Sequence, residues 1–115
     1  MQPFGGDFDW VYVSGKITDD TPELVKQNLQ KFFDRAAEFR AQGRRVFNPA
    51  DHEDATKSSL TGATDGVWEH YLAIDCDFIV QHRPKMHMMK GWEDSRGARL
   101  EHALAKRLGL VIEYE

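Results

Sequence analysis

Two acidic residues fall among the apolar positions of predicted helices, where a carboxylate needs either a partner or a function. Projection of residues 96–108 at about 3.6 residues per turn places Glu101 inside an apolar stripe made of Gly97, Leu100, Leu104 and Leu108. A second helix is predicted from residue 67 to 81 or 82. Asp75 lies near the middle of its apolar arc, and Glu69 and Asp77 project outside that arc, which consists of Val67, Trp68, Tyr71, Leu72, Ile74, Phe78 and Ile79.

An inward-facing acid is informative because burying an unpaired charge is costly. Such a group takes a partner or shifts its pKa, and acids with perturbed pKa values concentrate at active sites. The structural alternative is an ion pair for Glu101, for instance with an arginine of a neighbouring element, and a buried cap or hydrogen-bonded acid for Asp75. Two inward acids on helices that flank one sheet edge favour function, because paired carboxylates divide nucleophilic and acid/base work at an anomeric carbon in most glycosidases.

The start of the helix that carries Glu101 is suited to an anion. Residues 94–97 open this helix, so free backbone N–H groups and the helix dipole attract a negative charge, and Gly97 permits close approach of a ligand. The alternative is that Ser95 or Asp94 is simply the N-cap of the helix. Both interpretations stay open on these residues alone.

Other side chains extend this predicted ligand site. The turn of Ser14, Gly15 and Lys16 follows the first strand, and Lys16 can pair with a phosphate at the same end of the sheet. Trp92 is a candidate to stack on a base, with partly buried packing as the alternative. We predict no metal site, because no metal-ligand spacing connects the five histidines, which are His52, His70, His82, His87 and His102.

Strands and helices alternate along the chain. Strands are predicted at 10–14, 45–47, 85–89 and 110–114, and helices at 21–43, 67–82 and 96–108. The first of these helices begins with Thr21-Pro22-Glu23, and its apolar stripe consists of Val25, Leu29, Phe32, Phe33 and Ala36. The pattern predicts a three-layer α/β domain, Rossmann-like or flavodoxin-like, with an open parallel sheet of four or five strands and helices on both faces. Such sheets bind ligands beyond the carboxyl ends of their strands.

The segment after Asn48-Pro49 is polar as far as about Gly66. This length is unusual for a loop in a compact domain, and long loops are often lids or binding loops. A plain surface excursion is the alternative. Residues 1–9 have no periodicity and are expected to be a loose lead-in to the first strand.

Composition limits the function classes. A chain of 115 residues with 41% apolar content predicts one domain, residues 1–115, with one sizeable core. The net charge of −4 argues against a nucleic-acid partner, and the short apolar runs argue against a membrane role. A sole cysteine, Cys76, and a start unlike a signal peptide predict a reducing, cytoplasmic location.

The chain resembles the nucleoside 2-deoxyribosyltransferase-like superfamily, in a branch of small proteins from phages and bacteria, over nearly its whole length. The resemblance rests on residues 12–18 (YVSGKIT), Asn48-Pro49-Ala50 and the spaced Trp68, Tyr71 and Asp75. Its most specific block is residues 91–101 (GWEDSRGARLE), followed by Ala105 and Leu108-Gly109.

The resemblance implies roles for individual residues. It implies that Glu101 attacks the sugar C1′ carbon to form a covalent glycosyl-enzyme, that Asp75 assists proton transfer to the base, and that Tyr12 positions the nucleophile or sugar. In members that act on nucleoside monophosphates, the serine of the Ser-x-Gly turn before the nucleophile helix contacts the 5′-phosphate. The resemblance gives this role to Ser95 in the present chain. Many relatives have proline where this chain has Lys16, and the strand 85–89 is unusually polar and rich in methionine, which leaves the substrate open.

The leading hypothesis is therefore an N-glycosidase or deoxyribosyltransferase that needs no cofactor and acts on a small nucleoside or nucleotide. We expect the ligand to be lined by Gly15, Lys16, Asn48, Trp92, Ser95 and Gly97. The resemblance also implies a homodimer or larger homo-oligomer. The rival hypothesis is a non-catalytic nucleotide-binding or sensing module, because a fold and its pocket can persist without turnover.

Overall fold

The computed structural model describes residues 10–51 and 67–115 of the chain. The predicted lead-in at residues 1–9 and most of the predicted polar loop, residues 52–66, lie outside this part, as do the side chains of Val67 and Trp68. The strands are β1 (Trp10–Ser14), β2 (Arg45–Phe47), β3 (Lys85–Met88) and β4 (Ile112–Tyr114). The helices are α2 (Pro22–Ala41), α4 (Val67–His82) and α5 (Arg96–Leu108), with short 3-10 turns η1 (Pro49–Asp51) and η2 (Trp92–Asp94).

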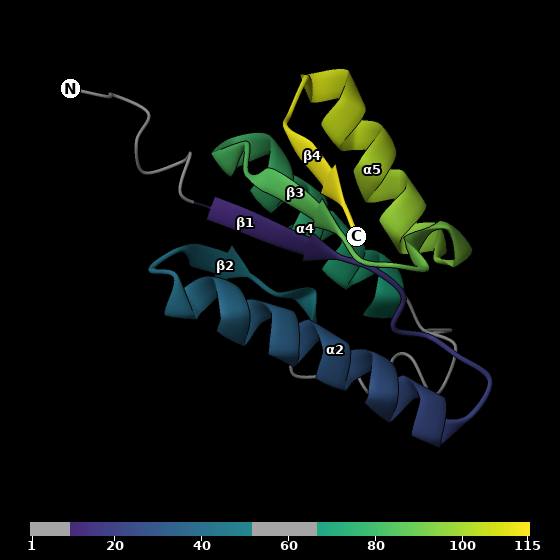
Figure 1. The fold of residues 1–115 in the computed structure, drawn as a ribbon. Coiled ribbons are helices and arrows are strands. Elements are labelled where there is room, and N and C mark those ends of the chain that lie inside the picture. The colour runs from purple at the N-terminus through teal and green to yellow at the C-terminus, as the bar shows by residue number, and fades with distance from the viewer. Residues whose placement is uncertain (1–9, 52–66) are drawn as a thin grey trace.

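The four strands form one parallel sheet in the order β2-β1-β3-β4 (Figure 1). The predicted α/β class and parallel sheet are confirmed, although β3 and β4 are shorter than expected. β1 is a central strand, with β2 on one side and β3 on the other. Parallel neighbours need crossover connections, and α2 and α5 supply them between β1 and β2 and between β3 and β4.

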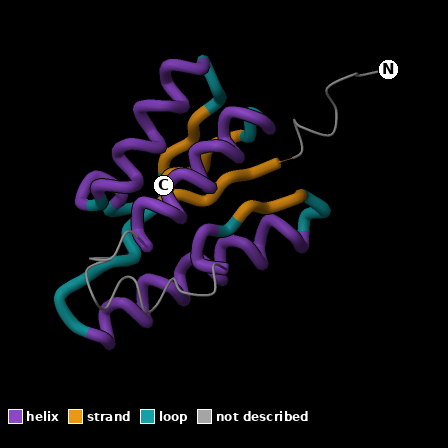
Figure 2. Tube along the Cα trace, turned by 180° about the vertical axis from the view of Figure 1, so that it is seen from behind, coloured by secondary structure: helices purple, strands orange, loops and turns teal. Residues whose placement is uncertain are grey.

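Alternate residues of β1 enter two separate apolar clusters, one on each face of the sheet. Val11 and Val13 pack with Val25, Leu29, Phe32 and other residues of α2. Tyr12 packs on the opposite face with Met86 and Met88 of β3, Ile79 of α4 and Ala98 and Ala105 of α5. The protein therefore has three layers, with α2 on one face and α4 and α5 on the other (Figures 1 and 2).

Local signals explain where the helices begin and end. Thr21 is the N-cap of α2, since its hydroxyl accepts a hydrogen bond from the Leu24 N–H at 3.2 Å. α5 ends at Gly109, whose φ of 72° lies in the left-handed region that favours glycine. In residues 10–51 and 67–115 no helix is long and apolar enough to cross a membrane.

Three apolar residues that helical periodicity places on buried faces are exposed in the structure. Phe33 of α2, Ile74 of α4 and Leu100 of α5 are exposed. Each lies one residue, about 100° of helix rotation, from a buried neighbour, namely Phe32, Asp75 and Glu101. The buried faces are therefore narrower than the apolar pattern suggests, and that of α5 consists of Ala98, Glu101 and Ala105.

Candidate active site

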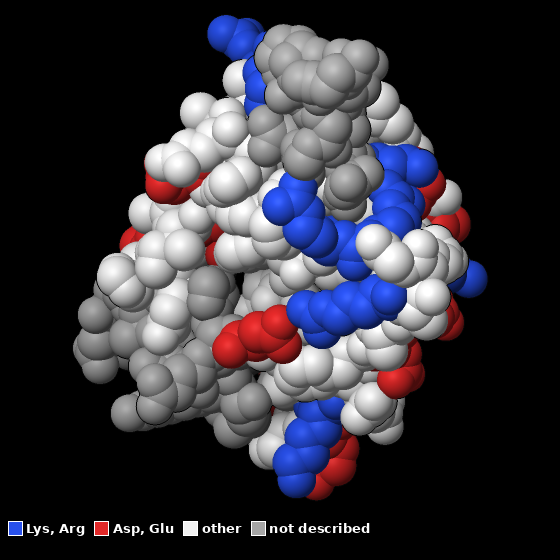
Figure 3. Space-filling view, turned by 90° about the vertical axis from the view of Figure 1, so that its left-hand side faces the viewer, with Lys and Arg blue, Asp and Glu red and all other residues white. Residues whose placement is uncertain are grey.

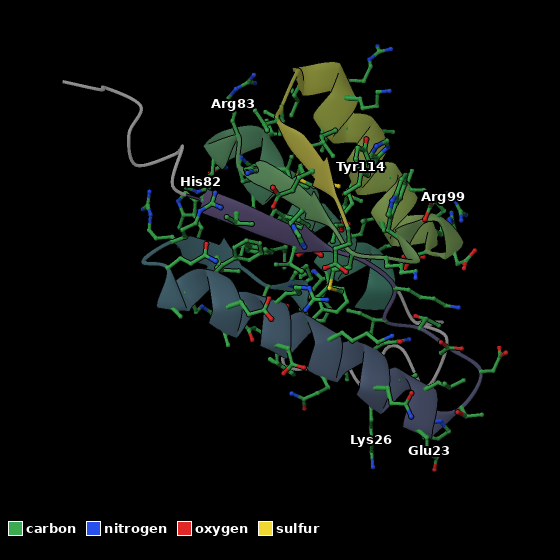
Figure 4. All side chains as sticks on the ribbon, in the orientation of Figure 1. Glu23, Lys26, His82, Arg83, Arg99 and Tyr114 are labelled. Carbon is green, nitrogen blue, oxygen red and sulfur yellow. The ribbon has the colours of Figure 1, made fainter. Side chains whose placement is uncertain are left out.

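The carboxyl end of β1 and the first turns of α5 meet at one place. Tyr12 and Ser14 are two residues apart on a strand, so their side chains point to the same face of the sheet, toward α5. Figure 4 shows Arg99, from the first turns of α5, at the opposite end of the molecule from His82 and Arg83, where α4 ends. The first turns of α5 thus lie at the end of the sheet where ligands bind in this fold class.

Glu101 is fixed by hydrogen bonds to both of its carboxylate oxygens. The Tyr12 phenol donates to Oε2 at 2.9 Å, and the Ser14 hydroxyl donates to Oε1 at 2.8 Å. All three side chains are buried, with Glu101 only 6% exposed and Tyr12 and Ser14 fully enclosed. The prediction that Glu101 faces inward is confirmed, and so is the inward position of Asp75, which is also 6% exposed.

The electrostatics of this cluster favour the protonated form of Glu101. Burial, and then the nearby charge of Asp75, raise the pKa of Glu101 to about 8, although the hydrogen bonds from Ser14 and Tyr12 act in the opposite direction. Burial and the charge of Glu101 also raise the pKa of Tyr12 well above its usual value. Burial, Glu101 and Asp75 raise the pKa of the Cys76 thiol to about 11, which places Cys76 beside the same acids.

In the part of the chain that the structure describes, no lysine or arginine forms an ion pair with Glu101. Figure 3 looks onto the side of the molecule at which the strands begin, and lysine and arginine side chains gather there. Arg45 and Lys85 are the first residues of β2 and β3, at the end of the sheet opposite to Glu101. The arginine partner that would make Glu101 a structural ion pair is therefore absent among residues 10–51 and 67–115.

The predicted phosphate-binding residues lie around the same end of the sheet. Ser95 is the N-cap of α5, with its hydroxyl accepting a hydrogen bond from the Ala98 N–H at 3.1 Å, and Gly97 lies in the first turn of this helix. Lys16 follows β1 directly and lies 3.7 Å from the Asp19 carboxylate. Ser95 thus has the capping role that the sequence left open.

The structure gives packing reasons for three other predicted ligand residues. At Gly15 an added Cβ atom would lie 2.8 Å from the terminal methyl and 3.2 Å from the Cβ of Met89, so a larger residue would force the Met89 side chain to shift. Asn48 is buried, and its Oδ1 accepts a hydrogen bond from the Ala50 N–H at 3.0 Å, which orders the turn η1. Trp92 packs on His102, with ring centroids 4.3 Å apart.

Ser14 is the residue of this cluster that sequence reasoning missed. The sequence pattern indicates Ser14 only as part of the turn with Gly15 and Lys16. The available signal was its position two residues after Tyr12, which puts both hydroxyls on one face of a strand. Within residues 10–51 and 67–115 no group of three or more histidine, cysteine, aspartate or glutamate side chains is arranged to hold a metal ion.

The fold and this site define the protein as an open parallel α/β domain with a buried pair of acids beside its central strand. A family model described as a domain of unknown function, DUF4406, matches residues 9–114. The chain therefore belongs to the DUF4406 family. No curated protein matches it.

Proposed function

We propose that this protein cleaves or transfers the N-glycosidic bond of a nucleoside or nucleotide, with Glu101 as the nucleophile. The observation that carries the proposal is the buried Glu101 carboxylate, which has a hydroxyl donor on each oxygen and Asp75 nearby. The resemblance of residues 12–18 and 91–101 to the nucleoside 2-deoxyribosyltransferase-like superfamily supplies the substrate class.

In this mechanism one Glu101 oxygen attacks C1′ while the bond from C1′ to the base nitrogen breaks. The bonding electrons go to the base, which takes a proton from the acid form of Asp75. The product is a glycosyl ester of Glu101. Water or a second base then attacks C1′, the Asp75 carboxylate takes the proton of this acceptor, and Glu101 leaves as a carboxylate.

The start of α5 supports a 5′-phosphate in this proposal. Ser95 uses an oxygen lone pair to cap the helix, so its O–H group is still able to donate to a phosphate oxygen. The N-terminal N–H groups of α5 and the partly exposed Lys16 ammonium would add to this attraction. We further propose that the working form is a homo-oligomer in the cytoplasm.

The test is to incubate purified protein with nucleosides, 2′-deoxynucleosides and their 5′-monophosphates, with and without an acceptor base, and to measure base release. We expect release from at least one deoxy compound, faster with the monophosphate, and a covalent glycosyl adduct on Glu101 detectable by mass spectrometry. If no compound loses its base while a nucleotide still raises the melting temperature, the protein is a binding module. Equal affinity for a nucleoside and its monophosphate in calorimetry would remove phosphate recognition from the proposal.

A further inference from the structure

Ser14 has a single side-chain hydrogen bond in the described part of the chain. Its hydroxyl donates to Glu101 Oε1 at 2.8 Å, across 87 positions of sequence. The side chain is fully enclosed, so water cannot act as a substitute partner. An enclosed hydroxyl without a partner is costly, and the contact with Glu101 therefore matters to both residues.

The sheet itself does not need a hydroxyl at this position. The backbone of Ser14 is held by β3, because its carbonyl accepts a hydrogen bond from the Met89 N–H at 2.8 Å and the residue pairs with Met88. On the same face Tyr12, Met86 and Met88 belong to one apolar cluster. An alanine would satisfy the strand equally well, so the reason for a serine lies in Glu101.

We propose that Ser14 is a positioning residue for Glu101: its hydroxyl holds one oxygen of the carboxyl group while Tyr12 holds the other, so that the group is fixed in plane. A carboxylate oxygen has two lone-pair sites, so each oxygen of Glu101 retains one for attack on a substrate. The effect on turnover rests on the proposed function. The effect on the Glu101 carboxyl group does not.

The balance of charges around Glu101 explains why a second donor is needed. The titratable groups that face Glu101 from neighbouring elements are Tyr12 of β1 and Asp75 and Cys76 of α4. None of these is a cation, and burial and Asp75 both raise the pKa of Glu101. The hydroxyls of Ser14 and Tyr12 act in the opposite direction, so losing either one makes the reactive carboxylate rarer near neutral pH.

The experiment compares Ser14→Ala with wild-type protein by following the Glu101 side-chain carboxyl signal in carbon NMR as pH is varied. We expect the titration midpoint of Glu101 to rise by about one pH unit in Ser14→Ala. If Glu101 is the nucleophile, kcat/KM for base release at pH 7 falls by about tenfold, mainly through kcat, and recovers as pH is raised. A merely structural role for Ser14 would not move either pH profile.

Two further variants separate loss of the Ser14 hydrogen bond from loss of stability. Ser14→Cys preserves the size of the side chain with a much weaker donor, so it should also shift the titration upward even if Ser14→Ala fails to fold. Thr21→Ala also removes a hydroxyl and costs stability, at the cap of α2, and should leave the Glu101 titration unchanged. An unchanged Glu101 midpoint in the Ser14 variants would overturn the proposal. A shifted midpoint in protein that releases no base would support Ser14 as positioning residue and remove the glycosidase function instead.

Discussion

Glu101 and Glu115 are both carboxylic acids packed against the same sheet, but they lie on opposite faces of it and contact different groups. Glu101 lies on the α4 and α5 side, between hydroxyl donors and a second acid. Glu115 follows β4 and contacts Arg35 of α2, the backbone N–H of Lys90, and His87 Nε2, the last at 2.8 Å. Deeper burial and different partners therefore separate two residues of one chemical type.

The pKa shifts of the two acids run in opposite directions. The Arg35, His87 and Lys90 contacts outweigh burial and lower the pKa of Glu115 to about 2. The neighbouring Glu113, which pairs with Lys85 and His87 at 2.8 Å each, also has a lowered pKa despite partial burial. The α2 side thus contains the structural ion pairs that were the alternative for Glu101. An inward acid becomes a functional candidate when its neighbours supply donors without a cation.

The largest expected effect separates the two glutamates by activity. Glu101→Gln keeps the shape of the side chain but removes the nucleophilic charge, so base release should fall by about four to six orders of magnitude while nucleotide binding survives. Glu115→Gln is the matched control and should retain wild-type turnover within about twofold. Steady-state rates and calorimetry measure the two effects. The nucleophile assignment is falsified if Glu101→Gln retains wild-type turnover.

Asp75→Asn should have the next largest effect. If Asp75 is the proton donor of the proposed reaction, its loss should slow base release by roughly 10²–10⁴-fold. The same change removes a negative charge beside Glu101, so the pKa of Glu101 should fall toward its ordinary value. Single-turnover kinetics and the NMR titration of Glu101 measure these outcomes. A Glu101 titration that does not respond would show that the two acids are not coupled.

Stability should depend on pH in opposite ways at the two sites. The pKa of Glu101 is raised from 4.5 to about 8, so its contribution to folding is complete below pH 4.5 and is lost as pH rises toward 8. We expect this loss to be on the order of a few kcal/mol. The pKa of Glu115 is lowered from 4.5 to about 2, so its contribution is present above pH 4.5 and lost as pH falls toward 2.

Urea unfolding of wild-type protein, Glu101→Gln and Glu115→Gln between about pH 2 and pH 8 measures how the free energy of unfolding depends on pH at each site. Glu101→Gln should flatten the decline between pH 4.5 and 8, and Glu115→Gln should flatten the decline on the acid side. If Glu101→Gln keeps the wild-type slope, Glu101 does not carry the raised pKa.

The smallest expected effect concerns Arg35. Arg35→Ala removes the ion pair with Glu115, and because both side chains are partly exposed the free energy of unfolding should fall by only about 1 kcal/mol. Turnover and the Glu101 titration should stay as in wild-type protein. A loss of turnover in folded Arg35→Ala would mean that the two faces of the sheet are coupled. It would contradict the view that the Glu101 and Glu115 sites are independent.

Local patterns predicted the elements well and their partners poorly. Helical periodicity was enough to show that Glu101 and Asp75 face inward, because that direction depends on neighbouring residues of the same helix. The same periodicity misplaced Leu100, since an apolar side chain tolerates exposure and a broad stripe does not mark its own edge. Periodicity therefore predicts the direction of a side chain better than the extent of its burial.

Contacts between distant elements were harder to predict. The pairing of Ser14 with Glu101 and the cluster around Glu115 both depend on which elements become neighbours, which no local pattern encodes. His87, Glu113 and Glu115 come together only because β3 and β4 pair in parallel and Arg35 reaches them from α2. The Glu101 and Asp75 cluster was easier to anticipate, since the family resemblance had already related its members.

The central position of β1 has a consequence for the dynamics of the site. Both donors to Glu101 lie on a strand that has neighbours on each side, and the alternate residues of that strand build the core under α2. A shift of β1 by one residue in register would turn Tyr12 and Ser14 away from Glu101. It would also move Val11 and Val13 from the α2 face of the sheet to the face of α4 and α5. A change of strand register at β1 therefore requires opening of the whole sheet, and the backbone amides of β1 should exchange with solvent as slowly as global unfolding allows.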